Sequence, residues 1–423
     1  MRKPGFLHST FGRISPSLTE DTHYLVITSV VISTFFIGFG GGVVFPIIPN
    51  LGVILGISPF IVGIILSASS ISRLFANAPA GILVDRIGTR KPFIAGMFIQ
   101  GVATCGYIVA ILAPGTAAWF IATRVFWGAG SALVFATAYT IAADVSDDRS
   151  RGTSMGLIRG GSLFGVPTGL VLGGIVSELA GTIPAFFLAS VLAFFATSVA
   201  YMTIPETHVT PGTQKSISPW DVDTSAPAIT VGMVNFSMLL AYEGAFFATL
   251  VLFLGEAELS IASFGPQGTS GIFMAVTVIA SGIFMFVGGY VTDNQRSRVP
   301  TLIFFLLMTS AGFSFLAASE SLVLLTVACI VLGTGQGGTA GPLMALLADL
   351  TPNEQMGRAV GTNNVFGDIG AALGPVVALS LIGLVGFVPV LLAAAMLPLF
   401  ATVVLLCGIF YETGEINPSI GTS

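Results

Sequence analysis

The chain has 423 residues, of which 54% are hydrophobic and only 8% are charged, and its formal net charge is −5 at pH 7. A soluble domain carries roughly 25% charged residues, so this composition excludes an ordinary soluble protein. It also provides no basic surface for binding a nucleic acid. We therefore expect a protein whose main partner is the lipid bilayer.

Twelve apolar segments are long enough to cross a bilayer, which takes about 20 residues in a helix. A backbone that faces lipid must satisfy its own hydrogen bonds, so each segment is predicted to be helical. The segments are 24–48, 58–84, 92–113, 117–142, 153–177, 183–204, 227–254, 268–290, 299–318, 321–347, 359–384 and 387–411. The predicted fold is an all-α integral membrane protein with two six-helix halves.

Polar segments divide the chain into parts. The stretch 205–226 contains three prolines, several Ser and Thr residues and mixed charge, which is typical of a flexible linker. The predicted parts are a tail at 1–22, a half at 23–204, this linker, a second half at 227–411 and a tail at 412–423.

The positions of the 15 Lys and Arg residues predict how the chain lies in the membrane. Apart from Arg73 and Arg124, they lie before the first helix, in alternate loops, at helix ends such as Arg159 in the fifth helix, and in the linker. The other loops contain none. Basic loops remain cytoplasmic, so we expect a multi-pass protein of the cytoplasmic membrane with both termini in the cytoplasm.

A charged signature occurs twice. The first copy contains, in order, Gly81, Asp85, Arg86, Gly88, Arg90, Lys91 and Pro92. Four of its positions recur 208 residues later as Gly289, Asp293, Arg298 and Pro300, and Asp144 recurs 205 residues later as Asp349. Such a repeat indicates two copies of one unit. Repeated halves in a membrane are typical of transporters with a site between the halves.

This signature resembles the gate loop of the major facilitator superfamily of transporters, and the resemblance extends over about residues 20–411. In that family the loop forms a cytoplasmic latch that stabilises one access state. The resemblance implies that the latch residues are Gly81, Asp85, Arg86, Gly88, Arg90, Lys91, Asp144, Asp293, Arg298 and Asp349. The second copy departs from the pattern at Asn294 and Arg296. A charged turn that only sets the topology is the alternative.

Two further motifs resemble those of the family. Arg124 in helix 4 is followed by Gly128 and Gly130, a pattern that the family links to proton coupling. An arginine inside the membrane is costly unless it is paired or lies in a wet cavity, although a structural role on backbone carbonyls is the alternative. In helix 5, a ridge of glycines spaced four residues apart permits close packing: Gly161, Gly165, Gly169 and Gly173. The last three, with Gly174, partly match an antiporter motif of the family, although Leu170 stands where that motif has proline. The second half carries the motif's Gly-Pro pair as Gly374 and Pro375.

Other polar residues at membrane depth are candidates for proton coupling or substrate binding. They are Arg73 with Asn77 in helix 2, Asn235, Tyr242 and Glu243 in helix 7, and Asn364 with Asp368 in helix 11. Carboxyl groups held away from water can take up and release protons, so Glu243 and Asp368 are the candidate carriers. Hydrogen bonding between packed helices is the alternative for Asp368. Arg73 and Arg124 are candidate counter-charges or ligands for an anionic group.

We expect a central cavity lined by helices 1, 2, 4, 5, 7, 8, 10 and 11, which rocking halves would expose to one side at a time. In helix 1, the glycines of 38–42 with Pro46 and Pro49 predict a break or softening of its outer half. No cofactor and no metal are expected. The glycine-rich segment 333–338 matches a dinucleotide-binding pattern but follows no strand.

The sequence therefore predicts a secondary transporter for a small molecule. Proton-coupled efflux of amphiphilic or drug-like compounds is the first hypothesis, and proton-coupled uptake of a small metabolite or organic anion is the second. A receptor without transport activity is a more remote hypothesis, and no catalytic constellation indicates an enzyme. Sodium could replace protons, and a monomer would be sufficient.

Overall fold

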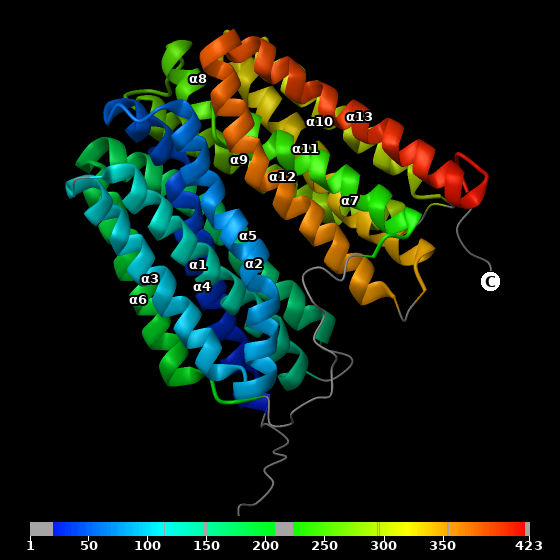
Figure 1. Cartoon of the computed structure of the whole chain (residues 1–423), viewed down its shortest axis with the longest axis horizontal. Coiled ribbons are helices and arrows are strands. Elements are labelled where there is room, and N and C mark those ends of the chain that lie inside the picture. The colour runs from blue at the N-terminus through cyan, green and yellow to red at the C-terminus, as the bar shows by residue number, and fades with distance from the viewer. Residues whose placement is uncertain are drawn as a thin grey trace, which may run out of the picture.

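A computed structural model describes residues 20–113, 115–146, 151–207, 223–293, 295, 297–352 and 355–418. Every regular element in this part of the chain is a helix, and the helices form two bundles that meet at one end (Figure 1). The predicted tails and linker lie partly outside the described residues, as do Asn294 and Arg296.

The first bundle contains the first six spans. These are α1 (Glu20–Ile54), α2 (Pro59–Ile87), α3 (Arg90–Leu112), α4 (Thr116–Val145), α5 (Arg151–Ala180) and α6 (Thr182–Thr203). Tight reversals join neighbouring helices, as at Gly181, where a φ of 100° falls in a region that glycine tolerates and most other residues avoid. Such a turn lets α5 and α6 lie against each other.

The second bundle contains the remaining elements. These are α7 (Ala226–Leu239), η1 (Leu240–Phe247), α8 (Leu250–Glu256), α9 (Pro266–Asp293), α10 (Val299–Ala317), α11 (Leu322–Leu350), α12 (Met356–Val385) and α13 (Phe387–Thr413). The first three of them form a single span over Ala226–Glu256, so the described residues contain twelve helices long and apolar enough to cross a membrane. This agrees with the twelve predicted spans.

The element η1 is a π-helical segment in the middle of the seventh span. Its widened turn ends with a hydrogen bond of 3.1 Å from the Ala248 N–H to the Glu243 carbonyl, five residues back. Gly244 lies against the backbone of Gly374 in α12, where a Cβ atom would collide. Interruptions of this kind in α-helices are frequent at functional sites.

The predicted break in the first helix is wrong, because α1 continues as one helix through Pro46 and Pro49. Gly38 and Gly42 have a packing role instead. A Cβ atom at either position would collide with the backbone of α5, at Ser162 and Val166. The close contact between α1 and α5 keeps α1 in place along this face.

The two bundles contact each other through α2 against α12 and α5 against α9. Gly63 in α2 lies against Pro375 and Val376, and Gly271 in α9 lies against Leu170 of α5. These contacts lie near the start of α2 and α9 and the end of α5 and α12. We call this the sealed end, and we call the opposite end, where α6 ends and α7 begins, the linker end.

Candidate functional site

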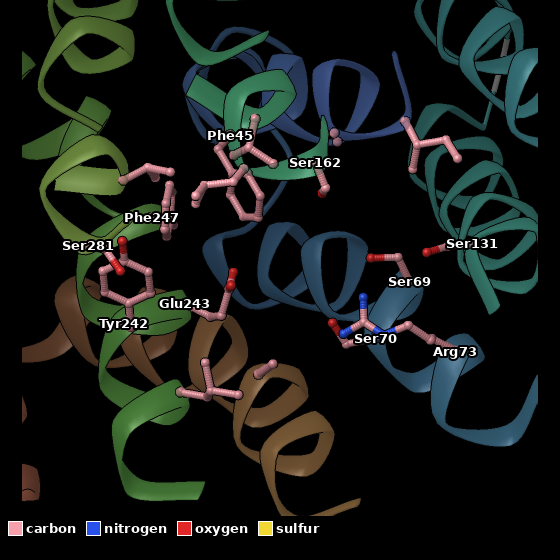
Figure 2. Close-up of a pocket in the computed structure, with 18 of the residues that line it drawn as sticks. Phe45, Ser69, Ser70, Arg73, Ser131, Ser162, Tyr242, Glu243, Phe247 and Ser281 are labelled. Carbon is pink, nitrogen blue, oxygen red and sulfur yellow. The ribbon is translucent and has the colours of Figure 1, made fainter. Parts of the chain in front are cut away.

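A cavity lies between the two bundles. Its inner chamber has a volume of about 500 Å³ and is lined by side chains from α1, α2, α4, α5, the seventh span, α9, α11 and α12 (Figure 2). Since α9, α11 and α12 are the eighth, tenth and eleventh spans, these are the eight spans that the sequence predicts. Aromatic rings of Phe45, Trp127 and Phe247 form part of the wall, and polar side chains such as Ser69 and Ser281 interrupt it.

An outer chamber of about 650 Å³ continues from the inner one towards the linker end. It reaches Arg358 and Gly361, in the first two turns of α12. The residues that line both chambers are Arg73, Phe135, Tyr139, Arg159 and Leu239. The cavity therefore opens at the linker end and stops below the contacts of the sealed end.

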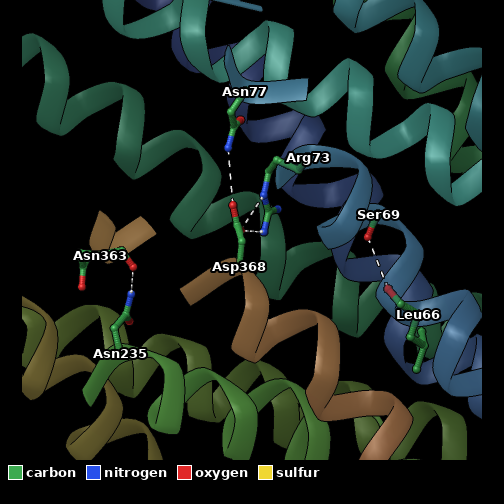
Figure 3. A network of polar contacts seen from close by, with 7 residues as sticks. All are labelled: Leu66, Ser69, Arg73, Asn77, Asn235, Asn363 and Asp368. Atoms are coloured by element: carbon green, nitrogen blue, oxygen red, sulfur yellow. Dashed lines mark hydrogen bonds and ion pairs between the residues drawn. The ribbon is translucent and has the colours of Figure 1, made fainter. Parts of the chain in front are cut away.

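An ion pair joins the two bundles at the boundary between the chambers (Figure 3). The Arg73 guanidinium donates to Oδ1 of Asp368 from Nη2 at 2.7 Å and from Nε at 3.2 Å. Asn77, one turn further along α2, donates a long hydrogen bond of 3.5 Å to Oδ2 of Asp368. Arg73 and Asn77 of α2 thus form one cluster with Asp368 of α12.

Glu243 extends from η1 into the inner chamber, into the same space as Arg73 (Figure 2). Tyr242 lines the chamber beside it and is mostly buried, with its ring stacked on Phe246 and edge-on to Phe247. The π-helical turn and the close approach of Gly244 to α12 position the glutamate. This carboxyl group is therefore available to a proton or to a molecule in the cavity.

Arg124 is 3% exposed and also lines the inner chamber. It donates from Nη2 to the Leu66 carbonyl at 2.9 Å, and its guanidinium lies 5.6 Å from the Trp127 ring centroid. Its Nε has no hydrogen-bond acceptor among the described residues. The hydrogen bond to the Leu66 carbonyl agrees with the structural role that the sequence analysis gave as the alternative. The Nε–H group is available to donate to a ligand.

The remaining polar candidates lie in the outer chamber. Asn364 lines this chamber one turn before Asp368. Asn235 also lines it and donates 3.0 Å to the Asn363 carbonyl, which ties α7 to α12 (Figure 3). Both side chains therefore lie on the path between the linker end and the ion pair.

The first copy of the gate loop is held inside its own half. The Thr89 N–H and the Thr89 hydroxyl both donate to Glu206, at 2.7 and 3.1 Å. Arg90 donates to the Tyr201 carbonyl at 2.9 Å, and Thr207 donates to Asp144 at 3.0 Å. In the described part of the chain, Asp85 has no hydrogen bond to Arg90 or to the loop amides. Gly81 and Arg86 lie in the last two turns of α2, Gly88 lies in the turn, and Lys91 lies in the first turn of α3.

The second copy forms a compact ionic cluster. Arg298 donates from Nε to Asp349 at 2.8 Å and from Nη1 to Asp293 at 2.9 Å. The hydrogen bond to Asp349 raises the pKa of the Arg298 guanidinium above its usual value. The copy that departs from the family pattern thus forms two ion pairs, and they tie the α9–α10 turn to the end of α11.

The glycine ridge of helix 5 packs against α1. A Cβ atom at Gly165 or Gly169 would collide with the carbonyl of Phe35 or Phe39, and one at Gly161 or Gly173 would crowd Val31 or Val43 of the same helix. Gly374 packs against η1, and its neighbour Pro375 lies against Gly63 of α2. These glycines act by packing helices closely.

Other residues at the site are not singled out by the sequence patterns. Arg159, counted above as a basic residue at a helix end, lines both chambers, as does Tyr139. Gln336 lines the inner chamber from α11. A polar residue two turns inside a predicted span, as Arg159 is in α5, is the signal that could have found it. No group of three or more metal-binding side chains occurs among the described residues.

Two bundles of membrane-spanning helices around a cavity that opens at one end define a membrane transporter. The chain belongs to the Major Facilitator Superfamily, whose family model matches residues 30–375 and 238–419. The family and the structural neighbours indicate a transporter rather than an enzyme.

Relatives and solved structures agree with this assignment. The chain is 26% identical to the multi-drug resistance efflux pump PmrA of Streptococcus pneumoniae over 87% of this chain and 92% of that protein. It is 24% identical to multidrug resistance protein 2 of Bacillus subtilis over 82% and 86%. A bacterial homologue of the human lysosomal transporter Spinster, in an inward-facing and unoccupied conformation, has the same fold, with a TM-score of 0.77, 11% identity and coverage of 94% and 98%.

Proposed function

We propose that this protein exports amphiphilic, drug-like compounds across the cytoplasmic membrane in exchange for protons. The observation that carries the proposal is the cavity between the halves, where Glu243 faces the space beside an Arg73–Asp368 pair that joins the halves. The multidrug efflux pumps among the relatives support export as the direction of transport. The aromatic wall suits an apolar substrate body.

Protonation would act on the contact between the halves. A proton on Asp368 removes the negative charge that holds Arg73, so the link between α2 and α12 weakens. A proton on Glu243 changes the charge that a substrate meets in the inner chamber. The two carboxyl groups would thus couple proton binding to both substrate affinity and the movement of the halves.

The halves at 23–204 and 227–411 would rock about the cavity, with the linker end in the cytoplasm together with both termini. The basic residues of the alternate loops support this orientation. In this orientation the structure corresponds to an inward-open state. The gate-loop residues Asp85, Arg86, Arg90 and Asp144 would exchange their contacts when the linker end closes.

The test uses proteoliposomes with an internal pH dye and an imposed pH gradient. Lipophilic cations, neutral drugs and organic anions are added singly, and the expected result is substrate-dependent proton movement opposite to that of the substrate. The double variant Glu243→Gln with Asp368→Asn should lose the proton movement. The control Glu320→Gln removes an acid in the turn between α10 and α11, outside the cavity, and should behave as the unmodified protein.

Proton flux that persists in the double variant would show that neither acid is the carrier. Proton movement in the same direction as the substrate would instead support the second candidate, which is proton-coupled uptake of a small metabolite or organic anion. The observation in favour of this candidate is that arginines outnumber acids on the cavity wall. A substrate flux that depends on a sodium gradient would show that sodium, and not the proton, is the coupling ion.

A further inference from the structure

The arginines of the inner chamber differ in what they contact. Arg73 is held by Asp368, and Arg124 is buried against the Leu66 carbonyl. Arg159, two turns inside α5, is exposed to the space where the two chambers join. It makes no hydrogen bond or ion pair within the described residues. The guanidinium of Arg159, at the boundary of the two chambers, thus has no partner in the part of the chain that the structure describes.

The charge on the cavity wall is positive. Among the residues that line the two chambers, four are arginines, namely Arg73, Arg124, Arg159 and Arg358, and two are acids, Glu243 and Asp368. Arg358 takes part in another interaction. Without it, one positive charge remains when both acids are ionised, and the excess grows when either acid binds a proton. A wall of this kind attracts an anion and repels a cation in every protonation state of the two acids.

Uncharged polar groups near Arg159 can complete the binding of an anionic group. Ser162 lies one turn further along α5 on the same face of the helix. Tyr139 of α4 lines the same two chambers as Arg159. Neither hydroxyl has a hydrogen bond in the described residues. Both can donate to an oxygen acceptor.

The inner chamber fits an apolar body behind such a group. Phe45 and Phe247 pack with ring centroids 4.9 Å apart at the deep side of the chamber, and Trp127 and Leu66 continue the wall. A molecule with its charge at Arg159 would therefore place its hydrophobic part against these side chains, away from the linker end.

We propose that the substrates are amphiphilic carboxylates and that Arg159 is the residue that binds the carboxylate. A guanidinium matches a carboxylate with two parallel hydrogen bonds, which a neutral or cationic analogue cannot form. This inference rests on the proposed transport function and specifies its substrate class. It differs from a role for Arg73 or Arg124, whose guanidinium groups already contact the protein.

Binding is measured separately from transport, so that the two proposals can fail independently. The probes are 2-naphthylacetate, 2-naphthylacetamide and 2-naphthylethylamine, which share an aromatic body and differ in charge. Calorimetric titration uses the full chain in lipid nanodiscs, with empty nanodiscs to correct for partition into lipid. We expect the carboxylate to bind about tenfold or more tightly than the amide, as a charged hydrogen bond implies, and the amine to bind most weakly.

Variants at Arg159 then assign the preference to this residue. Arg159→Gln should reduce the ratio of carboxylate to amide affinity to near one. The affinity for the amide that this variant retains shows that it is folded. Arg159→Lys keeps the charge but not the paired donors, and should retain part of the ratio. A wild-type protein without a preference for the carboxylate, or a preference that survives Arg159→Gln, overturns the inference.

Transport of the same three probes follows in proteoliposomes. Preferential binding of the carboxylate without any flux would refute the proposed transport cycle while upholding the assignment of Arg159. Flux of the amine or amide without carboxylate binding would uphold transport and refute the assignment.

Discussion

The carboxylate of Glu178, near the end of α5, accepts a hydrogen bond of 2.8 Å from the backbone N–H of Gly268, in the first turn of α9. Its other oxygen accepts 2.6 Å from the N–H of Gly265. A side chain of one half thereby caps a helix of the other half, where the helix dipole favours a negative charge. Ser177 adds a hydrogen bond of 3.1 Å to Gln267. These contacts hold the sealed end closed.

Removing this cap should open the sealed end. Glu178→Ala deletes two charge-assisted hydrogen bonds, and we expect the ratio of open to closed molecules at this end to rise by about tenfold or more. Spin labels at Leu112→Cys and Ser260→Cys, exposed positions on opposite halves near the sealed end, report the change as a longer distance by pulsed electron resonance.

The labelling background replaces Cys105, Cys329 and Cys407, so that only the two introduced thiols react. Glu320→Gln serves as a control, since it removes an exposed acid between α10 and α11 that has no hydrogen bond or ion pair among the described residues. A distance distribution that Glu178→Ala leaves unchanged would show that the cap does not stabilise the closed sealed end.

The Arg73–Asp368 pair gives a second prediction. Asp368→Asn leaves the guanidinium without its charged acceptor, and we expect a loss of about 1–3 kcal/mol of stability, because the pair is partly exposed. The exchange of the two residues, Arg73→Asp with Asp368→Arg, should recover part of that loss. Thermal unfolding in detergent measures each variant. If the loss of stability in the double exchange equals the sum of the losses in Arg73→Asp and in Asp368→Arg, the two residues are not coupled.

The second gate-loop cluster allows two carboxylates on one arginine to be compared. The Asp349 side chain is 21% exposed and that of Asp293 is 71% exposed. Asp349→Asn should therefore cost about 1–2 kcal/mol, and Asp293→Asn should cost about 0.5 kcal/mol or less because water screens it. Equal losses in thermal unfolding would contradict this assignment of the stronger contact to Asp349.

The contribution of Arg298 to the stability of this cluster should not depend on pH near neutrality. Because the hydrogen bond to Asp349 raises the pKa of Arg298, its contribution is fully present below the unfolded pKa and is lost only as pH rises through the folded value. Between about pH 6 and about pH 9, the stability difference between Arg298→Gln and the unmodified protein should stay constant. A difference that shrinks across this range would contradict that assignment.

Gly165 offers a test of helix packing. Gly165→Ala places a Cβ atom against the Phe35 carbonyl, so α1 and α5 must separate, at a cost of about 1–3 kcal/mol. Gly160→Ala in the same helix faces open space and should be neutral or stabilising by up to about 1 kcal/mol. Unfolding temperatures that fall equally in both variants would show that the effect comes from the helix backbone and not from the contact.

Local patterns in the chain are sufficient to predict the number of spans and the family. The length of an apolar run decides whether a helix can cross the bilayer, and each run is a property of neighbouring residues. Gly81, Asp85 and Arg90 likewise lie within ten consecutive residues, at the end of α2 and the start of α3. The predicted break of α1 is wrong because Gly38 and Gly42 serve to pack α1 against α5. The local composition around these glycines does not show that another helix lies against them.

The sequence by itself determined an all-helical membrane protein with two repeated halves. It also singled out Glu243, Asp368 and the gate-loop residues as candidates. Only the tertiary structure decided that Arg73 pairs with Asp368, 295 residues away, and that Glu243 projects from a π-helical turn. It also decided that Arg159 makes no hydrogen bond or ion pair with the described residues. The physical reason is that membrane insertion depends on the hydropathy of each segment alone. Which charges are paired depends on how close packing between the two halves brings their helices together.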